Sequence, residues 1–281
     1  MKNVAVIGSG TMGNGIAHIF ALKGIKVQLF DDSFPALERA VSIINNNLER
    51  QVKKQIITSD EKALALSNIS TETLISNLLP ETELIIEAII ENKNVKLKLY
   101  NKLINLINNT CIIATNTSSI SITELAPRQL ADRFIGMHFM NPVPIMELVE
   151  IIKGYSTSED TLKVVVETVK YLNKKPVIVN DYPGFIANRI LMPMINEAIF
   201  ALYENVATAE DIDQVMKLGM NHPMGPLALA DFIGLDICLN ILDVLYNGFN
   251  DSKYRPCPLL KNMVNAGNLG RKTGQGFYSY T

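Results

Sequence analysis

The sequence predicts an α/β protein in which a mostly parallel sheet carries helices on both faces and a smaller all-α domain follows. Two observations predict the sheet: the chain opens on an apolar strand that runs into a glycine-rich turn, and short apolar runs then alternate with segments of helical periodicity. A third observation predicts the helical domain, because from about residue 184 onward the helical periods continue without clear strands.

The start of the chain carries the pattern of a dinucleotide-binding unit. The apolar strand Val4–Ile7 leads into Gly8-Ser-Gly10-Thr-Met-Gly13, a helix follows, and a second strand ends in Asp31. In a Rossmann-type unit the first glycine permits a tight turn, the second leaves room for the pyrophosphate, and the third lets helix and strand pack closely. The positive end of the helix faces the phosphates. The expected cofactor-binding residues of this unit are Gly8, Gly10, Thr11, Met12, Gly13 and Asp31.

Asp31 favours NAD over NADP as the cofactor. It closes the second strand 18 residues after Gly13, near the spacing of the acid that binds the adenine ribose hydroxyls. Its carboxylate would repel a 2′-phosphate, Asp32 adds charge of the same sign, and residues 32–36 contain no arginine. The alternative is a structural βαβ unit whose glycine turn binds no ligand.

The other elements of the first domain follow in order. Ser33 can cap a long helix whose apolar residues recur at helical spacing as far as Val52, and this helix ends in the basic cluster Arg50, Lys53 and Lys54. The cluster is either a solvated helix end or a contact for an anionic substrate. Apolar runs predict strands at residues 84–90, 111–115, 134–138, 148–152 and 177–179, and helical periods predict helices at 95–107 and 161–172.

The pattern changes at Asp181-Tyr-Pro183-Gly184, where we place the domain boundary. We predict an NAD-binding Rossmann-type domain over residues 1–183 and an all-α substrate and dimerisation domain over residues 184–281. The second domain is small for an independent core. We therefore expect it to complete its burial against the first domain or against another copy of itself.

The composition excludes several classes of partner. The net charge of −2 over 281 residues gives no general attraction to nucleic acid or to an anionic membrane, and the apolar runs are too short to span a bilayer. The three widely spaced cysteines predict reduced thiols, and the first strand begins too close to Met1 for a leader peptide. We expect a cytoplasmic protein that binds no metal, nucleic acid or membrane.

His138 and Glu150 are the candidate acid/base pair. His138 ends a predicted strand before an irregular loop with two prolines, at the sheet edge where open α/β proteins bind ligands. Glu150 shares a strand face with apolar residues, so it needs a buried partner, and a histidine is a suitable one. An imidazole can take the proton that an alcohol loses as hydride leaves. The alternative is a structural ion pair.

Ser118 and Asn188 are candidate contacts for the reacting oxygen of a substrate. Ser118 follows the predicted strand at 111–115, again at a carboxyl end, although the polar segment around it could equally cap a helix. Asn188 begins a helix whose apolar stripe continues through Ile195 and Ile199, so its amide must bond either to substrate or to backbone.

Taken together, these residues resemble the L-3-hydroxyacyl-CoA dehydrogenase family, and within it the short bacterial 3-hydroxybutyryl-CoA dehydrogenases. The matching segments occur in the family's order along almost the whole chain. They are Val6–Gly13, Glu87–Asn92, Asn116–Ser119, His138–Pro142, Glu147–Glu150, Pro183–Arg189, His222–Pro226 and Gly270–Tyr278. Met140 and Glu147 stand where the family often has Phe and Lys, and neither change removes a catalytic group.

The resemblance implies a role for each matching position. His138 would be the catalytic acid/base with Glu150 as its partner, and Ser118 and Asn188 would bond the reacting oxygen. It implies a homodimer through the C-terminal helical domain and a CoA contact at Arg50, Lys53 and Lys54. The residues implied to line the cofactor site near the nicotinamide are Glu91, Lys96, Ser118, Asn141 and Lys272.

The sequence thus predicts an NAD-dependent oxidoreductase that interconverts (S)-3-hydroxyacyl-CoA and 3-ketoacyl-CoA, with the four-carbon thioester as the expected substrate. Two alternatives remain at this point. One is a dehydrogenase of a small 3-hydroxy acid without CoA on the same scaffold. The other is a catalytically silent dinucleotide-binding protein, which would have no need of His138, Glu150, Ser118 and Asn188 together.

Overall fold

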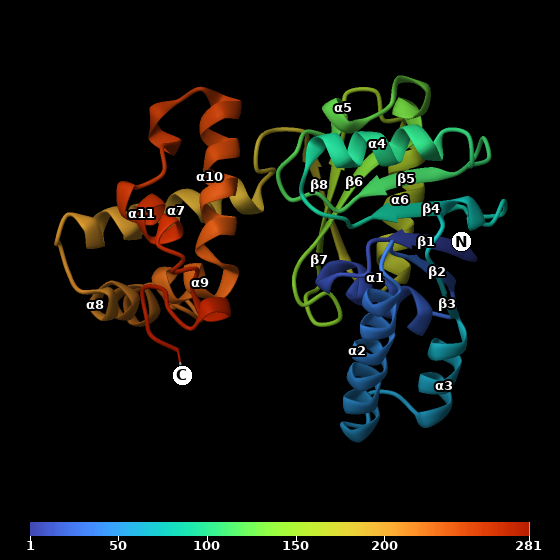
Figure 1. The fold of residues 1–281 in the computed structure, drawn as a ribbon, viewed down its shortest axis with the longest axis horizontal. Helices are drawn as coiled ribbons and strands as arrows, with labels where there is room; N and C mark the ends of the chain where they lie inside the picture. Colours follow the sequence, from blue (N-terminus) through green and yellow to red (C-terminus); the bar gives the residue numbers. More distant parts are fainter. Residues whose placement is uncertain (281) are drawn as a thin grey trace. The chain divides into compact units, whose positions relative to one another are not determined.

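The computed structural model describes residues 1–280 and divides the chain into two compact units, Met1–Asp181 and a second unit that begins at Tyr182. The first unit is a sheet covered by helices, and the second is built of helices (Figure 1). This arrangement confirms the predicted fold class. None of the helices in residues 1–280 is both long and apolar enough to cross a membrane.

The first unit contains one sheet, which has eight strands within the described residues, in the order β3-β2-β1-β4-β5-β6-β7-β8. All neighbouring strands run parallel except β6 and β7, which are antiparallel. The strand order reverses between β1 and β4, and this switch point is where open α/β sheets bind ligands. The strands are β1 (Asn3–Ile7), β2 (Lys26–Phe30), β3 (Ile69–Glu72), β4 (Leu84–Glu87), β5 (Ile112–Thr115), β6 (Phe134–Phe139), β7 (Leu148–Lys153) and β8 (Lys175–Asn180).

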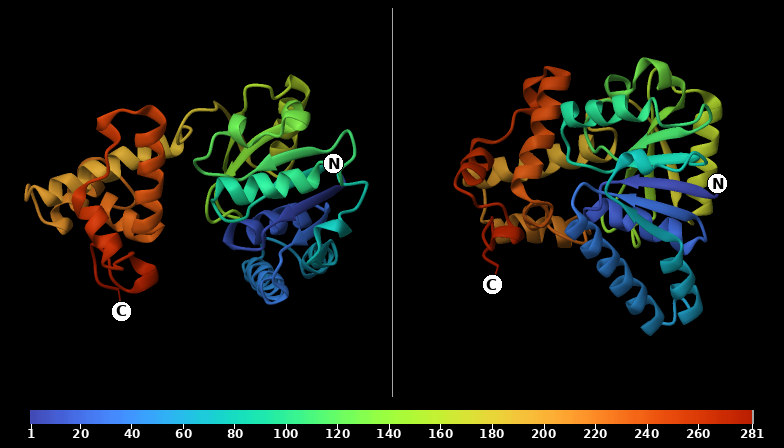
Figure 2. Two further views of the ribbon diagram at one scale, coloured as in Figure 1. Left: turned by 45° about the horizontal axis from the view of Figure 1, so that its top comes forward. Right: turned by 45° about the vertical axis from the view of Figure 1, so that its right-hand side comes forward.

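Helices cover both faces of this sheet, which explains why its central strands are apolar on both sides (Figures 1 and 2). One buried core joins α1, α2, α3 and α6 to one face of the strands. On the other face, Tyr100 of α4 packs edge-on against Phe134 of β6, with ring centroids 4.9 Å apart. The helices are α1 (Thr11–Leu22), α2 (Phe34–Lys53), α3 (Ser59–Ser67), α4 (Lys93–Leu103), α5 (Ile122–Leu125) and α6 (Glu159–Tyr171).

The structure corrects several predicted boundaries in the first unit. The strand predicted at 84–90 ends at Glu87. The next residue, Ala88, still donates its N–H to Ile7 O, but its carbonyl lies against Gly8. The helix predicted at 95–107 begins at Lys93, where Asn92 caps it, and ends at Leu103. The helix α3 and the edge strand β3 were not predicted. Three of the four residues of β3 are polar and none is buried, so Ile69–Glu72 forms no apolar run.

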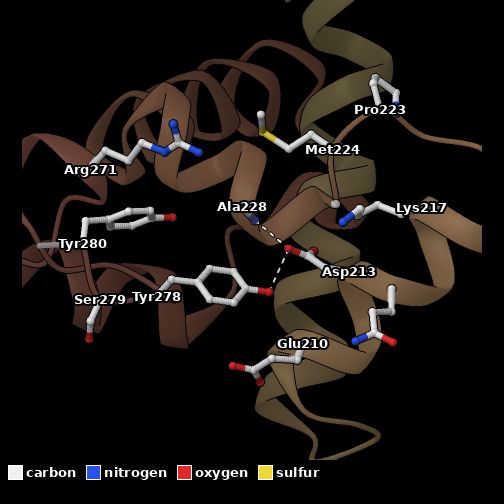
Figure 3. A pocket seen from close by; sticks show the side chains of 12 residues that line it. Glu210, Asp213, Lys217, Pro223, Met224, Ala228, Arg271, Tyr278, Ser279 and Tyr280 are labelled. Atoms are coloured by element: carbon white, nitrogen blue, oxygen red, sulfur yellow. Dashed lines mark hydrogen bonds between the residues drawn. The ribbon is translucent and has the colours of Figure 1, made fainter.

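The second unit has a hydrophobic core of its own, made by α7, α9, α10 and α11. Its buried Asp213 accepts hydrogen bonds from Leu227 N and Ala228 N at the start of α9 and from the Tyr278 hydroxyl, and so attaches the end of the chain to two helices. Figure 3 shows this carboxylate beside a pocket of about 480 Å³. The helices are α7 (Ala187–Tyr203), α8 (Ala209–Gln214), α9 (Pro226–Ile233), α10 (Leu235–Phe249) and α11 (Pro258–Asn265), with a π-helical turn at Val215–Gly219.

Candidate active site

The glycine turn after β1 has the shape that a bound pyrophosphate requires. Gly8 has φ +101°, and a Cβ on it would lie 2.5 Å from the carbonyl oxygen of Ala88. A Cβ on Gly13 would lie 1.7 Å from the Gly8 oxygen, so α1 can approach the turn only because this residue is glycine. By contrast, a Cβ on Gly10 would meet no atom within 4 Å. The space beside Gly10 is open at the N-terminus of α1, which is where a phosphate is stabilised.

Asp31 follows the last residue of β2 and is held by Ser9 of the glycine turn and by Ser33 at the start of α2. Its carboxylate accepts hydrogen bonds from Ser9 N at 2.9 Å, from Ser9 Oγ at 2.7 Å and from Ser33 N at 3.1 Å. Partial burial opposes ionisation of Asp31, but these hydrogen bonds outweigh it and keep its pKa below the ordinary value. The residue is therefore an oriented anion that can accept ribose hydroxyls and would repel a 2′-phosphate. Together with the glycine turn, it fits NAD.

His138 and Glu150 are directly opposite each other on the antiparallel strands β6 and β7. His138 Nδ1 lies 2.8 Å from Glu150 Oε2, and both side chains are buried. The carboxylate orients the ring so that, in the neutral imidazole, the proton is on Nδ1 and the acceptor lone pair is on Nε2. This arrangement can take up a proton at Nε2 and stabilise the imidazolium that results.

Ser118 lies in the turn after β5, and Glu91 organises that turn. Glu91 Oε1 accepts hydrogen bonds from Ser118 N at 2.9 Å, from Ser119 Oγ at 3.1 Å and from the Thr117 hydroxyl. Burial opposes the ionisation of Glu91, but the neighbouring Lys96 and the turn donors outweigh it and lower its pKa. Glu91 and Ser118, both predicted near the cofactor, are thus brought together by the structure.

A buried charged network lies behind Glu91, and its central residue, Glu87, is not among the predicted site residues. The Glu87 carboxylate accepts hydrogen bonds from Lys96 Nζ at 2.7 Å, from Thr115 Oγ1 at 2.7 Å and from the Tyr100 hydroxyl. Burial and the adjacent Glu87 carboxylate raise the pKa of Tyr100 well above its usual value, so its hydroxyl remains a donor. A carboxylate inside the apolar run Leu84–Ile90 is the signal that could have identified Glu87.

The loop between β6 and β7 carries the predicted cofactor residue Asn141 and is attached to the rest of the first unit at two places. The ammonium of Lys174 donates to Val143 O and to Met146 O, each at 2.7 Å. Val143 also packs against Gly15 of α1, where a Cβ would come within 2.9 Å of the valine side chain. This loop is therefore packed against α1, the helix that starts at the glycine turn.

Two predicted site residues belong to the second unit. Asn188 is buried in the first turn of α7, and its backbone N–H donates to Gly184 O at 3.1 Å. The ammonium of Lys272 contacts both carboxylate oxygens of Asp236, at 2.5 and 2.6 Å. Within its own unit, each residue is thus held in place by neighbours.

The predicted CoA cluster lies at the end of α2. Arg50, Lys53 and Lys54 are exposed, and Lys53 has a single loose ion pair with Glu49 at 4.0 Å. Because such a contact is weak, these cations can turn toward another anion. No group of three or more His, Cys, Asp or Glu side chains in residues 1–280 is placed to hold a metal ion.

Five predicted residues therefore lie at the carboxyl edge of the parallel strands of the first unit, where β1, β2, β4, β5 and β6 end: Gly10, Asp31, Glu91, Ser118 and His138. Lys96 lies behind this edge, inside the protein. Four further residues were not predicted, and each contacts one of the predicted residues or its loop: Ser9, Glu87, Thr117 and Lys174.

Comparisons with known proteins agree with this geometry. The profile of the NAD binding domain of 3-hydroxyacyl-CoA dehydrogenase matches residues 3–182, and the profile of the C-terminal domain matches residues 184–280. The 3-hydroxybutyryl-CoA dehydrogenase of Bradyrhizobium diazoefficiens is 52% identical over 281 residues, which are 100% of this chain and 96% of the relative. The mitochondrial hydroxyacyl-coenzyme A dehydrogenase of Rattus norvegicus is 42% identical, over 100% of this chain and 91% of the relative.

Among solved structures, the (S)-3-hydroxybutyryl-CoA dehydrogenase of Ralstonia eutropha is similar, with a TM-score of 0.95 and 48% identity over 100% of this chain and 99% of the other. The glycine turn at the switch point of the sheet and the matching NAD-binding domain define an NAD-dependent oxidoreductase. More narrowly, the chain belongs to the 3-hydroxyacyl-CoA dehydrogenase family.

Proposed function

We propose that this enzyme interconverts (S)-3-hydroxybutyryl-CoA and acetoacetyl-CoA, with His138 and Glu150 as its acid/base pair. The observation that carries the proposal is the 2.8 Å contact between His138 Nδ1 and Glu150 Oε2 at the carboxyl edge of the sheet. Relatives named 3-hydroxybutyryl-CoA dehydrogenase, 52% and 49% identical to this chain, support the four-carbon substrate.

NAD, when bound, supplies the hydride acceptor in oxidation and the hydride donor in reduction. In oxidation, His138 Nε2 takes the proton of the 3-hydroxyl group, and Glu150 stabilises the imidazolium. In reduction, His138 returns that proton to the 3-oxygen. Ser118 and Asn188 donate hydrogen bonds to the same oxygen and orient it. Glu91, Asn141 and Lys272 line the cofactor site, and Lys96 contributes to it from behind.

The first test is NADH oxidation with acetoacetyl-CoA by the wild-type enzyme and by His138→Gln. Glutamine keeps the polarity and much of the volume but cannot transfer the proton, so we expect kcat to fall by roughly 10²-fold or more. The Kd for NADH, measured by nucleotide fluorescence, should stay within about threefold of wild type. Wild-type turnover rates in the variant would rule out the assigned acid/base.

We also propose that Arg50, Lys53 and Lys54 contact the phosphates of the CoA moiety. The double variant Lys53→Glu/Lys54→Glu should raise the KM for acetoacetyl-CoA about tenfold or more, because it places anions where phosphate binds. Lys98→Glu/Lys102→Glu on α4 is the matched control, since it makes the same charge change on another exposed helix face. If the two double variants have the same KM for acetoacetyl-CoA, the cluster is not part of the substrate site.

The alternative substrate, a small 3-hydroxy acid without CoA, is tested in the same assay with free acetoacetate. An enzyme for a free acid would turn over acetoacetate efficiently and would be insensitive to the two Lys→Glu changes. A catalytically silent protein would bind NADH and oxidise it with neither substrate.

We propose further that the enzyme is a homodimer through its helical second domain and is cytoplasmic. The apolar side chains exposed on the second unit, among them Val206, Leu218 and Met220, support the proposed dimer.

The cysteines support the proposed cytoplasmic location, because Cys111, Cys238 and Cys257 are buried, free thiols.

A further inference from the structure

The pair Glu87–Lys96 is an ion pair almost without exposure to solvent. The Glu87 side chain is 0% exposed and that of Lys96 is 1% exposed, with Nζ and Oε1 2.7 Å apart. Such a pair adds little to stability, because the loss of hydration of both charges offsets their attraction. We therefore look for a role of the pair in the side chains and the turn that Glu87 and Lys96 hold in place.

Lys96 connects two carboxylates of different exposure. Besides Glu87, its ammonium contacts Glu91 Oε2 at 3.2 Å, and the Glu91 side chain reaches the surface of the unit. Glu91 therefore uses one oxygen for Lys96 and the other for the donors of the turn Thr117–Ser119. The second oxygen of Glu87 is occupied by Tyr100 and by Thr115, whose hydroxyl in turn accepts Thr117 N at 3.2 Å.

The network reaches the Ser118 turn from two sides. One connection runs from Glu87 through Lys96 and Glu91 to Ser118 N, and the other runs from Glu87 through Thr115 to Thr117 N. All members lie on α4, on β4, on β5 or in the loops that follow the two strands, so they belong to the first unit. A displacement of Lys96 would release Glu91 and, with it, the turn.

We propose that Glu87 and Lys96 are positioning residues. Through Glu91, whose Oε1 accepts Ser118 N at 2.9 Å and lies 3.4 Å from Ser118 Oγ, they fix the turn that carries the Ser118 hydroxyl. The proposal rests on the role given to Ser118 above. Lys96 then acts behind the cofactor site, because its ammonium is buried between two carboxylates. A misplacement of about 1 Å at a reacting group can cost on the order of 10²-fold in rate, so the positioning has a measurable effect.

The test compares Lys96→Met and Glu87→Gln with the wild-type enzyme, after thermal unfolding has shown that each variant is folded. We expect kcat with acetoacetyl-CoA to fall at least tenfold. The Kd for NADH should rise by a clearly smaller factor, because Glu91 also lines the proposed cofactor site. Amide hydrogen exchange of the peptide that covers residues 116–121 should become faster. Lys93→Met is the matched control, since Lys93 lies on the same helix and pairs with the exposed Glu124, and it should change none of these quantities.

The double variant Glu87→Gln/Lys96→Met tests whether the two residues act as one unit. Its kcat should be close to that of the more impaired single variant, because both changes break the same connection. Additive effects of the two changes on kcat would overturn the proposal. If Lys96→Met does not fold, Tyr100→Phe removes only the hydroxyl that donates to Glu87, and we expect a several-fold lower kcat with unchanged NADH binding.

Two outcomes contradict the positioning role directly. If Lys96 binds the cofactor itself, Lys96→Met will raise the Kd for NADH as much as it lowers kcat/KM, and exchange at 116–121 will be unchanged. If it is only structural, the melting temperature will fall while kcat of the folded enzyme stays at the wild-type value. A wild-type enzyme inactive with acetoacetyl-CoA would instead refute the proposed function, and the exchange measurement would still decide the positioning.

Discussion

His18 and His138 are both buried, yet their partners differ. His138 faces the Glu150 carboxylate, whereas His18 in α1 has the neutral amide of Gln51 3.5 Å from Nε2. Burial lowers the pKa of His18 to about 4, and the Gln51 contact only partly opposes this effect. At the residue scale, the hydrogen-bond partner thus distinguishes the two residues: His138 is a candidate proton carrier, whereas His18 stays neutral.

The low pKa of His18 predicts acid-sensitive folding. The unfolded chain binds a proton at this residue near pH 6.5, but the folded protein does so only near pH 4. The unfolded state therefore binds more protons between these values, and stability is lost as the pH falls from 6.5 to 4. The contribution of this residue is about 3 kcal/mol.

Urea unfolding at several pH values checks this prediction. The wild-type unfolding free energy should fall over this interval with a slope close to one proton, in addition to any other titrating groups. His18→Gln, which cannot titrate, should show a slope smaller by that amount. Identical slopes in the two proteins would show that His18 is protonated equally in both states.

At the scale of elements, the loop between β6 and β7 depends on a lysine from a distant element. Lys174 precedes β8, and its buried ammonium donates to two carbonyls of the loop. Lys174→Met keeps the aliphatic chain but leaves both carbonyls without this donor, so we expect a loss of about 1–3 kcal/mol in unfolding free energy.

The neighbouring residue provides the control for that change. Lys175 is exposed and pairs with the exposed Glu147, so Lys175→Met should not measurably change the midpoint of denaturant unfolding. If the two variants have the same midpoint, the hydrogen bonds of Lys174 do not contribute to holding the loop.

At the scale of the whole molecule, each unit has its own core, and the second unit exposes a large apolar side chain in its π-helical turn. Leu218 is 82% exposed. If the proposed dimer exists and covers this turn, Leu218→Glu would bury an unpaired charge, and the protein should change from dimer to monomer. Light scattering after size-exclusion chromatography measures this. Leu74→Glu, on the first unit, should remain dimeric; a dimeric Leu218→Glu variant would place the interface elsewhere.

The cofactor unit could be predicted in detail because its determinants are close together in the chain. Gly8, Gly13 and Asp31 lie within one strand–helix–strand unit, and their roles follow from the local path of the backbone. The same holds for the Ser33 cap, whose hydroxyl accepts Ala36 N at the start of α2. Periodicity also located most of the strands, since burial on both faces leaves continuous apolar runs.

By itself the sequence determined the fold class, the family and NAD as the cofactor, because short-range patterns and motif order specify all three. Only the tertiary structure decided that His138 and Glu150 are opposite each other, that Ser9 holds Asp31, and that Lys96 is enclosed by Glu87 and Glu91. These contacts join segments that the order of strands in the sheet brings together. A sequence pattern reports the period of an element, but not which element becomes its neighbour.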